Sequence, residues 1–227
     1  MTTSIFIIVP AYNEGRVIRS VLQSLIPLNC SIVVVDDGSV DETWSTICSL
    51  PVYALRHRIN LGPGAALATG IKFALQQNAD GLVFFDADGQ HHAEDIDVLV
   101  RPLLAKEADV VFGCRFLRAG DSKLVPPSRR VLLKGAVIVN RLMTGVWLKD
   151  AHNGLIGLTR EAAMKINLRE KGFAYHSELL HQVRKLGLRY AERPTRITYS
   201  EYSKDKGQSM WNALNIVVDL MLGRIFR

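Results

Sequence analysis

The sequence is poor in cysteine and lacks long apolar runs, and both shortages exclude whole classes of protein. Its 227 residues include three cysteines, Cys30, Cys48 and Cys114, and none of them has the spacing of a metal site. An odd number of scattered cysteines predicts reduced, buried thiols rather than a disulfide framework. No apolar run reaches the roughly 18–20 residues that a membrane-spanning helix needs.

Signals of secretion, repetition and nucleic-acid binding are also missing. The first residues carry no basic segment, and Ser4–Pro10 is typical of a strand rather than a signal peptide. No internal repeat or low-complexity linker divides the chain, whose composition is globular, with 48 % hydrophobic and 22 % charged residues. The stacking aromatics and motifs of a nucleic-acid binder are absent. We expect one domain with a C-terminal extension and no nucleic-acid partner.

Charge is divided unevenly between the two halves of the chain. Residues 1–112 hold 7 Lys and Arg against 13 Asp and Glu, whereas residues 113–227 hold 21 against 9. The acidic half is suited to a cation, and the basic half to phosphates or an acidic membrane surface.

Short apolar runs alternate with stretches of helical periodicity through the first half. This alternation predicts an α/β fold with a doubly wound, mostly parallel sheet and right-handed crossovers. The runs with the length and composition of strands are 5–9, 32–35, 52–55, 82–85 and 109–112. Between the first two runs, a helix is expected to begin at Asn13-Glu14.

The second half has a different pattern. A helix is predicted from Ser128 to Trp147, and strand pieces are predicted at 189–192 and 196–199. A final helix is predicted in residues 210–227, and it would be apolar except for a narrow polar stripe. That helix packs in the core, lies in a membrane interface or meets a partner, and the sequence leaves these alternatives open.

Two carboxylates one residue apart follow the run Leu82–Phe85. Asp86 and Asp88 fall where the predicted strand leaves the sheet, which is where open parallel sheets bind ligands. The two carboxylates repel each other unless a cation lies near them, and Mg²⁺ or Mn²⁺ takes oxygen ligands together with substrate phosphates. The pattern predicts a metal that bridges to a diphosphate, and a turn that caps the next helix is the plainer alternative.

Four short motifs follow one another at predicted strand ends. They are Val9-Pro10-Ala11-Tyr12-Asn13-Glu14, Val34-Val35-Asp36-Asp37-Gly38-Ser39, Asn60-Leu61-Gly62 and Asp86-Ala87-Asp88. Together they resemble glycosyltransferase family 2, and Asp88–Ile96 with Phe112–Arg115 is most similar to dolichol- and polyprenyl-phosphate mannose or glucose synthases. The resemblance runs from about Ile5 to Ser209. It implies the GT-A nucleotide-diphospho-sugar transferase fold for residues 1–209, with a donor half (1–112) and an acceptor half (113–209).

The resemblance implies specific roles on the donor side. The residues that match nucleotide-binding positions are Pro10, Tyr12, Glu14, Val35, Asp37, Gly62, Asp86 and Ala87. Asp37 matches the carboxylate that takes the uracil or guanine edge, although Asp36–Ser39 is also a good turn with a helix cap. Gly62 and Gly64 let the backbone approach the nucleotide or simply start a helix.

The resemblance also supplies the metal ligands and the phosphate-binding residues. The metal positions match Asp86, Asp88 and Gln90, with Mg²⁺ or Mn²⁺ as the ion and Asp88 as a catalytic residue. The acceptor-phosphate positions match Arg115, Arg129, Arg130, Lys204 and Lys206. Arginine suits phosphate through its bidentate fork, but each of these residues is equally acceptable as a surface charge. The aperiodic run around the two lysines suits a mobile lid or a solvated loop.

Asp150 begins Asp150-Ala151-His152-Asn153-Gly154-Leu155, where relatives often read Asp-Pro-Thr-Ser-Gly-Phe. If the acceptor is a sugar hydroxyl, an inverting transfer needs a general base, and Asp150 is the candidate. If the acceptor is a lipid phosphate, its oxygen is already anionic, and Asp150 would orient the sugar or the arginines instead.

The sequence therefore predicts an inverting, metal-dependent glycosyltransferase. Its donor is a UDP- or GDP-hexose, and its acceptor is a polyprenyl phosphate at the cytoplasmic face of the cell membrane, to which the protein binds peripherally. The alternative acceptor is a hydroxyl of a lipid-linked saccharide in cell-envelope polysaccharide synthesis. A small membrane partner or a homodimer stays open. A sugar nucleotidyltransferase is disfavoured because Pro10–Glu14 replaces the Gly-rich basic loop such an enzyme carries after its first strand.

Overall fold

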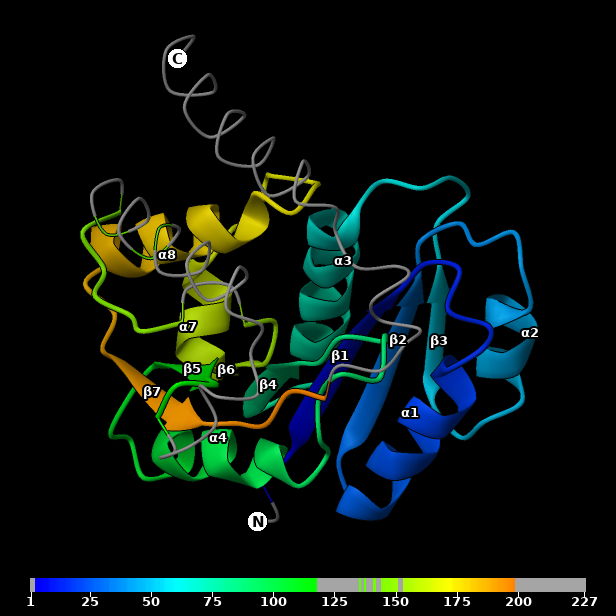
Figure 1. Ribbon diagram of the computed structural model, residues 1–227, viewed down its shortest axis with the longest axis horizontal. Coiled ribbons are helices and arrows are strands. Elements are labelled where there is room, and N and C mark those ends of the chain that lie inside the picture. The colour runs from blue at the N-terminus through cyan, green and yellow to red at the C-terminus, as the bar shows by residue number, and fades with distance from the viewer. Residues whose placement is uncertain are drawn as a thin grey trace, which may run out of the picture.

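The centre of the computed structural model is a seven-stranded sheet in the order β3-β2-β1-β4-β6-β5-β7 (Figure 1). The structure describes residues 3–117, 135, 137, 141, 144–150 and 153–198. The strands are β1 (Ile5–Ala11), β2 (Ser31–Asp36), β3 (Tyr53–Arg56), β4 (Gly81–Phe84), β5 (Val110–Cys114), β6 (Ile156–Thr159) and β7 (Tyr190–Pro194). This is the mostly parallel α/β architecture that the sequence predicts.

Helices cover both faces of the sheet, so that the molecule has three layers (Figure 1). They are α1 (Ile18–Leu25) with a following 3₁₀ turn (Ile26–Leu28), α2 (Thr43–Cys48), α3 (Pro63–Gln76), α4 (Asp95–Leu104), α7 (Arg160–Lys165) and α8 (Tyr175–Lys185). Because side chains alternate along a strand, β1 sends Phe6 and Ile8 to the core under α3, α7 and α8. It sends Ile5, Ile7 and Val9 to the core under α1, α2 and α4.

Strand direction decides which loops meet at the site. β1 pairs in parallel with β2 and β4, so the three strands end at one edge of the sheet. β6 runs antiparallel to β4 and β5, and its first residue Ile156 is paired with Phe84, the last residue of β4. The residues that precede β6 therefore arrive at the same edge as Asp86 and Asp88.

Two helix boundaries differ from those predicted. α1 begins at Ile18 rather than at Asn13-Glu14, because Asn13 has a φ of 53° and its side chain accepts a hydrogen bond from the Val40 N–H at 3.0 Å. The helix that was predicted to end at Trp147 ends before that residue. Gly145, with a φ of 71°, donates its N–H to Arg141 O and ends it in the left-handed conformation that glycine favours.

Two smaller predictions also need correction. The expectation of buried thiols is right for Cys114, where burial raises the pKa to about 12, but wrong for the exposed Cys48. Residues 196–199 do not form a strand piece within the described residues, apart from a single bridge between Ile197 and His91.

The expectations about the C-terminal part fall on residues that are not described. The helix over 210–227 and the boundary after residue 209 lie outside the described residues. Among the residues that the structure does describe, no helix has both the length and the apolar character needed to cross a membrane.

The close approach of α3 to β1 depends on Gly70. A Cβ atom at Gly70 would lie 2.3 Å from Cγ2 of Ile8, which is completely buried and β-branched and cannot rotate away easily. The absence of a side chain therefore sets the distance between helix and sheet.

Gly70→Ala is expected to lower the free energy of unfolding. Overpacking typically costs about 1–3 kcal/mol, and the gain in helix propensity of about 1 kcal/mol offsets only part of it. Gly172→Ala is the matched control, since a Cβ atom there meets nothing within 4 Å. Urea denaturation measures both variants, and equal stability of the two would contradict the close packing.

Candidate active site

The candidate site lies at the edge of the sheet where β1, β2 and β4 end. Asp86 and Asp88 follow β4 directly, and the side chain of Asp86 is 38 % exposed. The Asp88 carboxylate is held by one neighbour, since Oδ1 accepts from the Gln90 main-chain N–H at 3.0 Å and Oδ2 from Gln90 Nε2 at 2.8 Å. The predicted metal residues thus form one compact turn.

Asp86 is surrounded by groups that stabilise its negative charge. Its Oδ2 atom lies 3.1 Å from Nε2 of His91. Burial raises the pKa of Asp86, but the hydrogen bond with His91 and the electrostatic influence of His91, His176 and Arg115 outweigh it and leave the pKa below its usual value. Asp86 therefore stays ionised.

The pKa of Asp88 is shifted in the opposite direction. Burial, followed by the charge of Asp86, raises the pKa of Asp88 to about 6. The donor atoms of this turn are carboxylate and amide oxygens, which Mg²⁺ and Mn²⁺ prefer, and a cation would relieve the repulsion between the two carboxylates. Within the described residues, no three His, Cys, Asp or Glu side chains are grouped to hold a metal. The residues of this turn fit a hard divalent ion.

Gly154 lies directly against Asp86. A Cβ atom at this position would be 2.0 Å from Asp86 Oδ2 and 2.6 Å from its Cγ atom, so the carboxylate rests on the Cα atom of a residue that must be glycine. This contact follows from the reversed strand β6, which brings residues 153–155 to the end of β4.

The loops after β1 and β2 are tied to each other. The Asp37 N–H donates to Ala11 O at 2.8 Å, and the N–H groups of Asn13 and Glu14 donate to Ser39 Oγ and Thr43 Oγ1. Of the predicted nucleotide-binding residues on these two strands, Tyr12 is 42 % exposed at the rim, whereas Val35 is buried within β2. Pro10 and Glu14 are partly exposed.

Asp37 is enclosed by neighbouring segments of the chain. Its side chain is 3 % exposed, and Oδ1 lies 2.7 Å from His57 Nδ1. The Leu61 N–H donates to Oδ1 at 3.0 Å and the Gly62 N–H to Oδ2 at 2.7 Å. The carboxylate thus holds the turn at the start of α3, where the helix dipole also favours a negative charge.

Gly62 and Gly64 lie at the start of α3 and are packed closely against a neighbouring segment. Gly62 precedes Pro63 at the start of α3 and has a φ of 97°. A Cβ atom at Gly62 would lie 2.3 Å from Lys171 O, and one at Gly64 would lie 2.0 Å from Glu170 O. The absence of a side chain at both glycines therefore leaves room for the backbone of Glu170 and Lys171, which precede α8.

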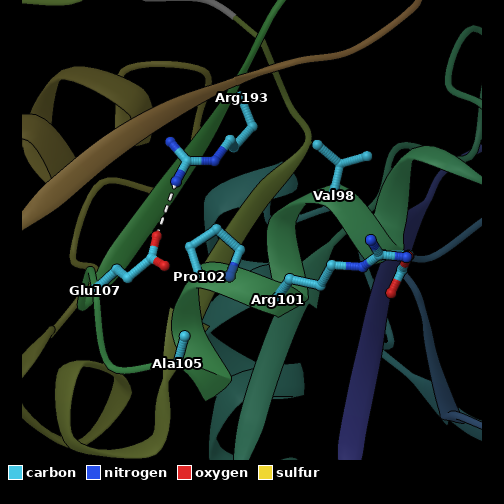
Figure 2. A pocket seen from close by; sticks show the side chains of 7 residues that line it. Val98, Arg101, Pro102, Ala105, Glu107 and Arg193 are labelled. Carbon is cyan, nitrogen blue, oxygen red and sulfur yellow. Dashed lines mark hydrogen bonds and ion pairs between the residues drawn. The ribbon is translucent and has the colours of Figure 1, made fainter.

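Two hollows on the surface of the described residues differ in their distance from the carboxylates. The first, of about 420 Å³, lies beside Asp37 and is lined by Gly38, Ser39, Val40, Arg56, His57 and Arg58. The second, of about 380 Å³, lies between Arg193 and the C-terminal part of α4 (Figure 2). Arg193 pairs there with Glu107 at 3.1 Å, and Arg101 pairs with Asp97. Because these charges are paired and the carboxylates lie at the other end of α4, the second hollow is not part of the site.

Arg115 and Asp150 form a buried ion pair. They are 6 % and 2 % exposed, and Asp150 Oδ2 accepts from Arg115 Nε at 2.6 Å and from its main-chain N–H at 3.0 Å. Among the described residues, the other oxygen, Oδ1, is buried and has no hydrogen-bond partner. The N–H groups of Lys149 and Asp150 donate to Glu192 Oε1, which fixes the backbone beneath the pair.

The structure brings some predicted residues together and adds others. One edge of the sheet carries the ends of β1, β2 and β4, as predicted. The predicted residues at this edge are Pro10, Tyr12, Asp37, Asp86 and Asp88. The residues predicted to bind the acceptor phosphate besides Arg115 lie outside the described residues: Arg129, Arg130, Lys204 and Lys206.

Sequence reasoning missed two histidines. His176 stacks on Tyr175 with 4.1 Å between the ring centroids, and it influences Asp86 from the start of α8. No motif marks His176, because it approaches Asp86 only through the packing of α8. His91 stands inside the motif that follows Asp88, but its contact with Asp86 has no separate sequence signal.

The family described as Glycosyl transferase family 2 matches residues 6–166. The chain belongs to glycosyltransferase family 2. The enzyme is 36 % identical to an uncharacterized protein of Methanocaldococcus jannaschii over 225 residues, which cover 98 % of this chain and 93 % of the relative. It is 31 % identical to the UDP-N-acetylglucosamine–dolichyl-phosphate N-acetylglucosaminyltransferase of Methanococcus voltae, with 96 % and 95 % of the two chains covered.

A solved structure supports the GT-A fold of this family 2 enzyme. Glucosyl-3-phosphoglycerate synthase from Mycobacterium tuberculosis, in complex with Mn²⁺ and UDP-glucose, superposes with a TM-score of 0.70. The match covers 96 % of this chain and 77 % of the synthase, at 22 % sequence identity. The likeness concerns the fold.

Gly154→Ala is expected to weaken the cation-dependent binding of UDP and GDP by about 10-fold or more, because displacing a metal-site carboxylate has effects of this size. The added methyl group would occupy the space of the Asp86 carboxylate. Fluorescence titration of both nucleotides with Mn²⁺ measures the effect, with Gly172→Ala as the matched control. Unchanged binding by Gly154→Ala would show that Asp86 is not needed in its present position.

Proposed function

We propose that this family 2 enzyme transfers a hexose, with inversion, from a nucleoside-diphosphate sugar to a polyprenyl phosphate at a membrane surface. The observation that carries the choice of acceptor is the buried pair of Arg115 and Asp150. An anionic phosphate oxygen needs no base, and it needs positive charge at the site.

Asp150 is poorly suited to act as a base in the geometry described. One of its oxygens accepts two hydrogen bonds from Arg115, and the side chain is 1 % exposed. A general base must come within hydrogen-bond distance of the proton that it removes. The pairing instead supports a role in which Asp150 fixes the guanidinium of Arg115 for the acceptor phosphate.

The donor is proposed to bind at the acidic edge. Pro10, Tyr12, Glu14, Val35, Asp37, Gly62 and Ala87 are proposed to surround the nucleotide. Asp86, Asp88 and Gln90 would hold Mg²⁺ or Mn²⁺, which neutralises the charge that develops on the leaving diphosphate. The M. voltae relative is named for a UDP-sugar, so UDP-sugars are tested first and GDP-hexoses beside them.

The acceptor is proposed to bind on the basic side. The lipid phosphate oxygen attacks the anomeric carbon as the bond to the nucleoside diphosphate breaks. Arg115 binds the acceptor phosphate together with residues outside the described part, namely Arg129, Arg130, Lys204 and Lys206. The same relative is named for dolichyl phosphate, which supports this class of acceptor.

The membrane is proposed to be reached from the cytoplasmic face. Residues 113–227 hold 21 Lys and Arg against 9 Asp and Glu, which suits an anionic lipid surface. In this proposal residues 1–209 are the catalytic domain and 210–227 contact the membrane, a small membrane partner or a second copy.

A hydroxyl of a lipid-linked saccharide is the second candidate acceptor. It is favoured by one observation, the buried Oδ1 atom of Asp150, which has no hydrogen-bond partner in the part of the chain that the structure describes. A buried oxygen without a hydrogen bond costs free energy. A hydroxyl of the saccharide substrate that donates to this oxygen would remove that cost.

A transfer assay tests the proposed reaction. With labelled UDP- and GDP-sugars, polyprenyl phosphate and Mn²⁺ or Mg²⁺, we expect an acid-labile lipid product. Asp88→Ala should lower its rate at least about 100-fold, because electrostatic stabilisation of the leaving group is lost. Asp97→Ala, on the exposed surface of α4, is the matched control. Nucleotide-sugar binding without transfer to the lipid phosphate would exclude this acceptor.

A double-mutant cycle separates the two roles of Asp150. If Asp150 acts through Arg115, Arg115→Ala and Asp150→Asn each lower kcat/KM for polyprenyl phosphate by up to about 100-fold, and the double variant loses no more than Arg115→Ala alone. If the losses multiply, Asp150 acts independently, as a base would. Thermal melting accompanies each variant because breaking a buried pair is destabilising.

A further inference from the structure

The loop after Asp88 is held by a strap, which we define as residues 195–198. The Thr198 N–H donates to Gln90 O at 2.9 Å, and His91 and Ile197 form an antiparallel bridge. The Thr198 hydroxyl also lies 2.8 Å from Nε2 of His92. The strap therefore holds the backbone at Gln90 and His91 and contacts the side chain of His92.

The strap is itself anchored to α4 by a buried carboxylate. Asp95, the first residue of α4, is 1 % exposed, and its Oδ2 atom accepts from the Arg196 main-chain N–H at 2.6 Å. Arg196 Nε lies 3.4 Å from Asp95 Oδ1, and a terminal nitrogen of Arg196 lies 2.8 Å from Glu94 Oε2. Thr195, at the other end of the strap, is fully buried. The loop that carries His91 is thus rigidly supported.

Among the described residues, the ring of His91 has one polar contact, which is with Asp86. The side chain is 3 % exposed, and its ring meets Phe85 edge-on with 5.6 Å between centroids. Nε2 lies 3.1 Å from Asp86 Oδ2, while Nδ1 is buried and has no hydrogen-bond partner within the described ranges. A buried N–H without an acceptor costs more than a bare ring nitrogen, so the geometry favours a proton on Nε2, where Asp86 accepts it.

The carboxylate of Asp86 is therefore fixed from two sides. His91 donates to Oδ2, and the Cα atom of Gly154 lies against the same oxygen. Among the described residues, no hydrogen bond reaches Oδ1 of Asp86. Rotation of the carboxylate is restrained by the protein, and one oxygen is left for a ligand.

We propose that His91 is a positioning residue that presents Asp86 to the divalent cation that accompanies the sugar diphosphate. It acts through Asp86 and touches neither substrate nor cation. Outer partners of this kind typically contribute about 10- to 100-fold in metal affinity. The inference rests on the proposed function for the identity of the ligand, but it concerns cation binding and not transfer.

Three substitutions of His91 separate hydrogen bonding from packing. His91→Phe keeps a ring against Phe85 and removes the donor. His91→Asn keeps an amide that is too short to reach Asp86. His91→Gln places an amide N–H near the position of Nε2, and so restores the donor without the ring.

The readout is the apparent Kd for Mn²⁺ in the presence of UDP or GDP, followed by loss of the free-ion electron paramagnetic resonance signal. We expect His91→Phe and His91→Asn to raise this Kd by about 10- to 100-fold, and His91→Gln to retain most of the wild-type affinity. Thermal melting identifies any variant that does not fold, and the comparison of His91→Asn with His91→Gln decides the matter if His91→Phe fails.

Three results would overturn the inference: wild-type affinity in His91→Phe or in a folded His91→Asn, an equal loss in all three variants, or a wild-type protein that does not bind Mn²⁺ with either nucleotide. The proposed function fails differently. A wild-type protein that binds Mn²⁺ and nucleotide but transfers nothing to polyprenyl phosphate would refute the acceptor and leave the role of His91 intact.

Discussion

The reversed strand β6 is the constraint on which the site depends. Because β6 runs against β4, its leading residues return to the edge where the parallel strands end. Gly154 then meets the carboxylate of Asp86. A parallel β6 would place these residues at the opposite edge of the sheet. The contact between Gly154 and Asp86 is thus a consequence of the strand topology.

Buried carboxylates at this edge share one arrangement. Asp37, Asp95 and Asp150 each accept a main-chain N–H from a segment distant in sequence, and each also faces a basic side chain. Such contacts are formed before any ligand arrives. Their common effect is to fix loops in place, so that binding does not have to order them. The partly exposed carboxylates of Asp86 and Asp88 therefore lie on loops that buried carboxylates hold in place.

The sequence predicts the donor half well because its signals are local. Apolar runs identify the strands, and the acidic pair after β4 follows from position alone. The start of α1 could not be predicted, since it depends on the contact between Asn13 and Val40. The enclosure of Asp37 and the approach of His176 to Asp86 also arise from packing between distant segments. The sequence of a turn such as Asp36–Ser39 does not show whether its carboxylate is exposed or buried in the folded protein.

The outer strand β7 has a consequence for self-association. In the described sheet it pairs with β5 alone, so its other side presents an edge to which a further strand could add. Glu192 and Arg193 place charges along it, and it ends at Pro194, which has no N–H to offer. This edge therefore resists extension by a second sheet. Contacts between copies of the enzyme are expected to use side-chain surfaces rather than continuous β-pairing through β7.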